Sequence, residues 1–190
     1  DLEESLKILE LKKNRKIYNK KNIKVLEPKE NIELKSVSYF YPNSSKVALK
    51  NIDLKIKIGS KIAFVGKTGS GKTTAANLIL GLLKPTSGKL ILDGNVIEEN
   101  DNINWQSLCS YVPQSINLLN SNIASNIAYG QNYSEISEEK LLTSLKLAQL
   151  EDLVEELPNG LKTNVGENGI RLSGGQRQRV ALARAFYRNT

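Results

Sequence analysis

The sequence Gly66-Lys67-Thr68-Gly69-Ser70-Gly71-Lys72-Thr73 decides the fold of this chain. The apolar run before it, residues 62–65, predicts a short buried strand, and the spacing of residues 75–80 after it predicts a helix lying on a sheet. The pattern G-x-x-x-x-G-K-[ST] between a strand and a helix predicts a phosphate-binding loop. A plain glycine-rich turn is the alternative, and the complete motif in this setting argues against it.

The residue types of this loop each serve phosphate binding. Glycines let consecutive backbone N–H groups point at phosphate oxygens without obstruction by a side chain. A helix that begins near Gly71 adds the positive end of its dipole. Lys72 would then reach the β- and γ-phosphates, and the Thr73 hydroxyl would bind Mg²⁺. The loop is therefore predicted to bind a nucleoside triphosphate.

Length and composition set outer limits. The chain has 190 residues, enough for one well-buried domain with or without a small subdomain. Its one cysteine, Cys109, excludes an internal disulfide framework and fits a reducing compartment. Because Cys109 lies in the apolar run 107–112, we expect a buried small hydrophobe rather than a reactive thiol. No apolar run approaches the length that crosses a bilayer.

The formal net charge of +7 is unevenly spread, because residues 11–24 contain many lysines and no acidic residue. Such a segment could bind nucleic acid or the anionic face of a membrane, and it could equally be a solvated linker. The sequence contains no Met, and Thr190 directly follows a basic helical run. We therefore expect it to be an internal part of a longer protein.

Hydrophobic spacing divides the rest of the chain into strands and helices. Predicted strands cover residues 32–39, 47–58, 89–92 and 107–112, with turns at 42–45 and 93–94. Predicted helices cover residues 1–11, 122–128, 137–147 and 151–157, and a last one begins at Ser173. The two strands that precede the phosphate loop indicate a small antiparallel sheet attached to the nucleotide-binding core.

A second informative stretch is Leu172-Ser173-Gly174-Gly175-Gln176-Arg177-Gln178-Arg179. A serine and two glycines at a helix N-terminus expose backbone N–H groups that can contact an anion. Taken alone, Ser173 could simply be an N-cap followed by a glycine turn. That interpretation is weak for the whole octapeptide downstream of a phosphate loop.

From Ile32 to its end the sequence resembles the ATP-binding cassette (ABC) family. The octapeptide resembles that family's signature motif, and residues 66–73 resemble its Walker A loop. Tyr41 is placed like the aromatic residue that stacks on adenine, and Gln114 like the Q-loop glutamine. Residues 116–130 and 163–169 are similar to segments of the exporter branch. Alone, Tyr41 could be a strand-end aromatic and Gln114 a solvated turn residue; their order in the chain favours the family roles.

The resemblance implies a set of site residues. The nucleotide-binding residues would be Tyr41, Gly66, Thr68, Gly69, Ser70, Gly71, Lys72, Thr73, Thr74, Ser173, Gly174, Gly175 and Gln176. Lys72 and Gln114 would have catalytic roles, and Thr73 and Gln114 would bind Mg²⁺. Two cassettes would face each other head to tail, so that ATP on residues 66–73 of one is covered by Ser173 and Gly175 of the other.

The implied fold class is α/β: a P-loop NTPase core with an N-terminal antiparallel β subdomain, an inserted α-helical subdomain and the C-terminal part of the core missing. Residues 1–30 would be the end of a transmembrane-domain helix and a linker, and residues 31–190 a partial nucleotide-binding domain with its helical subdomain at about 115–172. The family's Mg²⁺-binding aspartate and catalytic glutamate are expected about ten to fifteen residues after Thr190. We therefore expect this piece alone to bind ATP poorly and to hydrolyse it negligibly.

The resulting functional prediction is an ATPase cassette that powers export across a membrane by ATP-driven dimerisation. Its expected partners are a second nucleotide-binding domain, identical or not, and the transmembrane domain of its own chain at the cytoplasmic face of the cell (inner) membrane. A soluble ABC ATPase acting on nucleic acid or ribosomes is the alternative, but the spacing from Gln114 to Ser173 leaves no room for a long coiled-coil insertion, so no nucleic-acid partner is expected. A stand-alone importer cassette is a third possibility. The sequence does not identify the transported substrate.

Overall fold

The computed structural model describes residues 27–42, 46–98 and 101–190. The predicted helix over residues 1–11, the basic segment 11–24 and part of the turn 42–45 lie outside the described residues. Within the described ranges, no helix has both the length and the apolar character that a membrane span needs.

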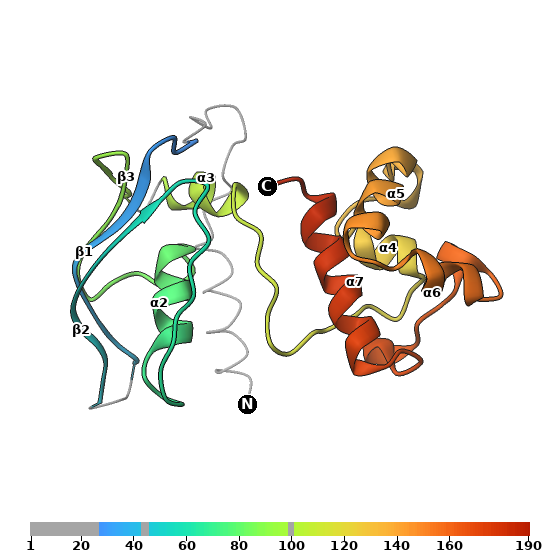
Figure 1. Cartoon of the computed structure of the whole chain (residues 1–190), viewed down its shortest axis with the longest axis horizontal. Coiled ribbons are helices and arrows are strands. Elements are labelled where there is room, and N and C mark those ends of the chain that lie inside the picture. The colour runs from blue at the N-terminus through green and yellow to red at the C-terminus, as the bar shows by residue number, and fades with distance from the viewer. Residues whose placement is uncertain (1–26, 43–45, 99–100) are drawn as a thin grey trace, which may run out of the picture.

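An antiparallel sheet forms one half of the molecule (Figure 1). It contains β1 (Asn31–Phe40), β2 (Val47–Lys57), β3 (Ser87–Leu92) and β4 (Asn95–Val96) in the order β2-β1-β3-β4. The register pairs Leu34 of β1 with Leu54 of β2 on one side and with Leu90 of β3 on the other. The predicted antiparallel sheet before the phosphate loop is therefore confirmed, with β3 added at its other edge.

Two helices cover the inner face of this sheet. α2 (Lys72–Ile79) follows the phosphate loop and buries Ala75 and Leu78, and α3 (Asn102–Ser107) buries Trp105. The Trp105 indole donates to the Ile79 carbonyl at 2.7 Å, which ties α3 to the end of α2. Together with the apolar face of the sheet, these side chains form the first hydrophobic core.

The first residues of the sheet are fastened by a carboxylate. Asp93, in the turn between β3 and β4, accepts hydrogen bonds from the backbone N–H groups of Lys29 (2.6 Å), Glu30 (2.9 Å) and Asn31 (2.8 Å). These bonds, from Asn31 first and then Lys29, stabilise the ionised form and lower the pKa of Asp93 below its ordinary value of 3.8. The start of β1 is thereby held to the turn between β3 and β4.

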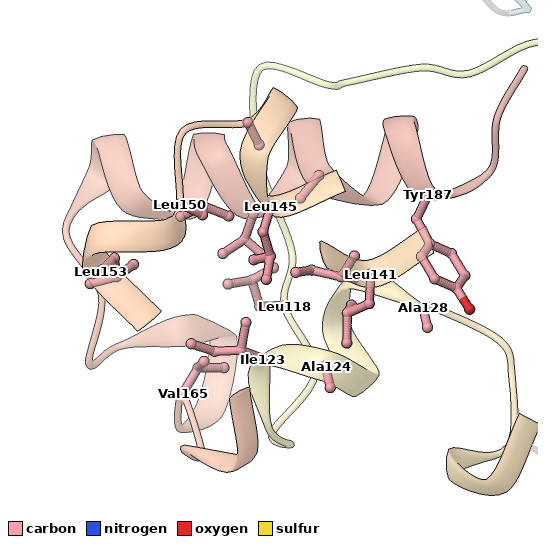
Figure 2. Close-up of a cluster of buried hydrophobic side chains, with 14 of the residues drawn as sticks. Leu118, Ile123, Ala124, Ala128, Leu141, Leu145, Leu150, Leu153, Val165 and Tyr187 are labelled. Atoms are coloured by element: carbon pink, nitrogen blue, oxygen red, sulfur yellow. The ribbon is translucent and has the colours of Figure 1, made fainter. Parts of the chain in front are cut away.

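The second half consists of short helices around a separate core (Figure 2). Its elements are α4 (Ile123–Ile127), η2 (Tyr133–Glu135), α5 (Glu138–Leu147), α6 (Glu151–Glu156), η3 (Gly160–Lys162), η4 (Glu167–Gly169) and α7 (Gly174–Tyr187). Leu118, Ile123, Leu141, Leu145 and Leu150 from different segments point into one cluster. The helices predicted over 122–128, 137–147 and 151–157 and from Ser173 are confirmed, with Asn122, Ser137 and Ser173 as N-caps.

Two predicted strands are wrong. Residues 62–65 are not a strand, and Val65 is 93% exposed. Residues 107–112 are not a strand either: Ser107 ends α3, and the following segment is the extended connection between the halves in Figure 1. An apolar run becomes a strand only where a neighbour accepts its backbone hydrogen bonds, and no strand of the described ranges pairs with either segment.

Cys109 lies at the start of this connection and is half-buried against the first core. Burial raises the pKa of its thiol to about 11, so the thiol stays protonated at neutral pH. The expectation of a packing residue rather than a reactive thiol is met, although the burial is partial.

Candidate functional site

The phosphate-loop motif forms an irregular turn that leads into α2. Gly69 has a φ of 80° and Gly71 a φ of 89°, both in the left-handed region that favours glycine. A Cβ on Gly71 would lie 2.7 Å from Leu49 Cδ2 and 2.8 Å from the Ala48 carbonyl oxygen. Gly71 is therefore required for its conformation and also for the close approach of α2 to β2.

The N-terminus of α2 is open. Gly71 is its N-cap, and no side chain of the described residues caps it. The first N–H groups of a helix have no partner within the helix and carry the positive end of its dipole. This end of α2 therefore offers donors to an anion.

Lys72, the first residue of α2, folds back over the loop. Its ammonium group donates to the carbonyl oxygens of Gly66 at 2.9 Å and Lys67 at 2.8 Å. These contacts hold the positive charge above the loop, where phosphate oxygens would compete with the carbonyls for its protons. The charge predicted to meet the phosphates is thus already positioned.

A pocket of about 280 Å³ opens beside the loop. Its wall comes from three places in the chain, the segment after β1, the start of β2 and the loop with α2: Tyr41, Lys46, Val47, Ala48, Gly69, Gly71, Lys72, Thr73 and Thr74. Lysines contribute to this wall, and among the described residues no carboxylate does. Its charge therefore favours an anionic ligand.

Tyr41 reaches this pocket from a distant part of the sequence. Its hydroxyl oxygen lies 3.0 Å from the Thr74 hydroxyl oxygen, close enough for a hydrogen bond that either group can donate. Its ring packs edge-to-face on Tyr39, with ring centroids 5.0 Å apart and an interplanar angle of 88°. The structure thus brings the predicted aromatic residue and the phosphate loop together.

The predicted Mg²⁺ ligands are only partly assembled. Thr73 is exposed at the pocket and presents a hydroxyl oxygen, a donor type that Mg²⁺ accepts. Gln114 is exposed in the connection between the halves and is not part of the pocket wall. Within the described residues, no cluster of three or more His, Cys, Asp or Glu side chains could hold a metal ion. The Thr73 hydroxyl is thus the one predicted Mg²⁺ ligand that the structure places at the described pocket.

The remaining predicted residues lie in two places. Gly66, Thr68 and Ser70 belong to the loop but not to the pocket wall. Ser173, Gly174, Gly175 and Gln176 lie at the N-terminus of α7 in the helical half, on the other side of the connection from α2 (Figure 1). The described pocket therefore contains no signature residue of its own chain.

The N-terminus of α7 carries a capping box formed by its own side chains. The Ser173 hydroxyl accepts from the Gln176 N–H at 3.2 Å, and the Gln176 side-chain oxygen accepts from the Ser173 N–H at 2.7 Å. Gly174 and Gly175 are exposed, and a Cβ on either would meet no described atom within 4 Å. This flat, unobstructed helix end can be approached closely by another molecule.

The loop before the signature is a defined structure. Ile123 donates to the Thr163 carbonyl at 3.2 Å and Val165 donates to the Ser121 carbonyl at 3.0 Å, which fixes it to the start of α4. Beyond these bonds, an open hollow is lined by Ile116, Asn117, Glu167, Asn168, Ile170 and Arg177. Ile170 is 78% exposed there.

Sequence analysis did not identify Lys46, Val47 and Ala48 as pocket residues. Lys46 directly precedes the strand β2, and Val47 and Ala48 begin it; the alternating pattern of this segment predicts a strand but carries no sign of a ligand. The nearest available signal is the spacing of Tyr41 and Val47 on either side of a turn, which places both at the same end of a hairpin.

Known proteins resemble this chain in sequence and in fold. The sequence profile of the ABC transporter family matches residues 49–190. An ATP-dependent lipid A-core flippase of Ralstonia nicotianae is 42% identical over 159 residues, which cover 83% of this chain and 27% of that protein. The Escherichia coli K12 protein of the same name is 38% identical over 159 residues, 84% of this chain and 27% of its own length. This chain therefore spans about a quarter of the length of these relatives.

Among solved structures, a bacterial Atm1-family ABC exporter with ATP bound superposes with a TM-score of 0.84 at 30% sequence identity. The alignment covers 99% of this chain and 33% of that one.

Proposed function

The chain belongs to the ABC transporter family, and from this premise we propose that it is the ATP-binding part of an exporter subunit that uses ATP hydrolysis to move a substrate across a membrane. The observation that carries the proposal is the pocket in which the open end of α2, the ammonium of Lys72 and the ring of Tyr41 meet.

The first step is the binding of ATP by this chain's own groups. Phosphate oxygens would accept from the N–H groups at the start of α2, and Lys72 would exchange the Gly66 and Lys67 carbonyls for them. The Thr73 hydroxyl would bind Mg²⁺, which supplies charge neutralisation for phosphoryl transfer. Tyr41 would stack on the base, because this residue lines the pocket and is 42% exposed.

The second step is closure by another cassette. In the described residues the signature lies away from the pocket of its own chain, and Gly174 and Gly175 face open space. We propose that this surface covers the nucleotide of a second nucleotide-binding domain in a head-to-tail dimer. Neither half-site alone surrounds a triphosphate, so the nucleotide would favour the closed state and hydrolysis would release it.

The third step is coupling to a transmembrane domain at the cytoplasmic face of a membrane. The relatives reported above are named as flippases and an exporter, which favours this proposal over a soluble ATPase that acts on nucleic acid. The loop 163–169 with the hollow beside it is the surface we assign to that contact, since residues 163–169 resemble the exporter-branch segment that contacts the transmembrane domain.

The test is the substitution Lys72→Ala in the full-length protein. Lys61→Ala is the control, because Lys61 is an exposed lysine that precedes the loop and is not part of the pocket wall. Lys72→Ala should weaken ATP binding at least tenfold, a loss of about 1.4 kcal/mol, and abolish transport. Lys61→Ala should keep both. Normal ATP binding and transport in Lys72→Ala would refute the assignment of the pocket.

A further inference from the structure

We infer that Thr74 is a positioning residue, whose hydroxyl holds the Tyr41 ring at the pocket so that the base platform and the phosphate loop form one preassembled unit. The inference rests on the proposed function, because it concerns how the same pocket recognises the base of its nucleotide.

The first support is the contact between the two hydroxyl groups. Their oxygens lie 3.0 Å apart, although the residues are separated by 33 positions in the sequence. Thr74 is only 5% exposed, so its hydroxyl has little access to water. A buried hydroxyl needs a protein partner, and Tyr41 supplies one. Removal of the Tyr41 hydroxyl would therefore leave the buried Thr74 hydroxyl without this partner, at a cost in free energy.

The second support is the contact of Tyr41 with Tyr39. Tyr39 is 7% exposed and belongs to the core of the sheet half, so it is a fixed neighbour. Its edge-to-face contact restrains the Tyr41 ring from β1, while the hydroxyl bond restrains the ring from α2. Together the two contacts restrain the Tyr41 side chain against taking other rotamers.

The third support is the rigid junction beneath the pocket. Gly71 packs so closely on Leu49 and Ala48 that not even a methyl group would fit between α2 and β2 there. Because Thr74 lies in the first turn of α2, its hydroxyl keeps a constant position relative to the phosphate loop. The Tyr41 ring is thereby set at a fixed distance from the phosphate-binding groups.

This arrangement has a consequence for affinity. A ring that is free to take other rotamers is competent for stacking only part of the time, and the apparent dissociation constant rises in proportion. Fixing the ring in advance removes that loss. The hydroxyl pair should therefore strengthen the binding of ligands that carry a base and should contribute nothing through Tyr41 to the binding of phosphates alone.

The experiment is a double-mutant cycle in the full-length protein. Tyr41→Phe keeps the stacking ring and Thr74→Val keeps the branched shape, and each removes one hydroxyl of the pair. Dissociation constants are measured for Mg-ATP and for inorganic tripolyphosphate, which has no base. Thermal unfolding of each variant shows that it is folded, and Thr74→Ser serves as the rescue variant because it restores the hydroxyl.

If Thr74 positions Tyr41, each single substitution weakens ATP binding about 3- to 10-fold, and the double variant binds no more weakly than the weaker single one. Tyr41→Phe leaves tripolyphosphate binding unchanged, and Thr74→Ser recovers most of the affinity for ATP. Three outcomes would overturn the inference: additive effects of the two substitutions on ATP binding, an unaltered affinity of Tyr41→Phe for ATP, or an equal loss of affinity of Tyr41→Phe for ATP and for tripolyphosphate.

The two proposals fail in different ways. A wild-type protein that binds neither ligand contradicts the proposed function, and this inference with it. A wild-type protein that binds ATP through Lys72 but shows no coupling between Tyr41 and Thr74 contradicts the inference alone. If Thr74→Val does not fold, the selectivity of Tyr41→Phe between ATP and tripolyphosphate decides the question by itself.

Discussion

Two helices of this molecule begin at glycine-rich motifs, and their N-termini are built differently. α2 begins after Gly71 with no side-chain cap among the described residues, beside a lysine and inside a pocket. α7 begins after Ser173 with both bonds of a capping box in place, on an open surface. The capping box of α7 engages only the N–H groups of Ser173 and Gln176, so those of Gly174 and Gly175 have no partner within their helix. The comparison teaches that the surroundings of a glycine-rich helix start, a pocket or an open surface, decide whether it serves its own chain or a second molecule.

The largest expected effect tests the α7 side of this comparison. Ser173→Arg places a long charged side chain on the open surface that we propose faces a second cassette. ATP binding to the isolated monomer should stay close to wild type, while ATP-dependent dimerisation and transport should be lost. Equilibrium binding and size-exclusion chromatography in the presence of Mg-ATP measure the two properties. Loss of binding in the monomer would show that Ser173 acts within its own chain.

A matched pair of glycine substitutions sharpens the comparison directly. Gly71→Ala should destabilise the protein by about 1–3 kcal/mol and weaken ATP binding, because it combines a φ of 89° with contacts of 2.7 Å and 2.8 Å. Gly174→Ala should be neutral or stabilise α7 by up to about 1 kcal/mol, because alanine is the better helix former.

Chemical denaturation of both variants provides the measurement. The contrast predicts that only Gly71→Ala shifts the midpoint to lower denaturant. Equal shifts at Gly71 and Gly174 would mean that the two helix ends are packed alike, contrary to the open space around Gly174.

The smallest expected effect is a pH-dependent change in the stability of the sheet half. The pKa of Asp93 is lowered in the folded state, so its contribution to stability is present above its ordinary pKa of 3.8 and disappears as the pH falls through the folded value. Wild type should therefore be slightly more stable than Asp93→Asn at neutral pH, and the difference should start to shrink as the pH approaches 3.8 and vanish only below the lower pKa of the folded state. Thermal unfolding between pH 7 and pH 3 checks this. A difference that persists in acid would assign the effect to shape rather than to charge.

The helical half offers the control for that experiment. Its polar anchor is Arg184, which donates to the Asn126 carbonyl at 2.9 Å and lies over the Tyr129 ring at 4.8 Å. Burial lowers the pKa of Arg184, but a guanidinium remains charged throughout this pH range. Arg184→Gln should therefore change stability by the same amount at neutral and at acid pH.

The sequence predicted the elements whose stability is local. The alternation in residues 32–39 and 47–58 predicts the hairpin of β1 and β2, and the capping serines predict the starts of α5 and α7. The likeness to a solved ABC exporter confirms the α/β ABC ATPase fold class. The proposed domain bounds and the roles of individual site residues remain predictions.

The failures have one physical cause. Residues 62–65 and 107–112 have the composition of strands, but a strand needs a neighbour, and none of the described strands lies beside them. The pattern of a segment indicates that it could form a strand, but not whether a neighbouring strand is present to pair with it. The pocket lining by Lys46, Val47 and Ala48 was not predicted because it likewise depends on which distant segment lies beside them, here the phosphate loop.

What the sequence determined by itself is the chemistry of each motif, because glycine torsions, helix caps and a lysine next to a helix start depend on residues a few positions apart. Only the tertiary structure decided which motifs share a site. It brings Tyr41 to Thr74 and leaves Ser173 and Gln114 outside the pocket. Contacts between distant residues depend on how whole elements pack, and that packing is a property of the two cores rather than of any single motif.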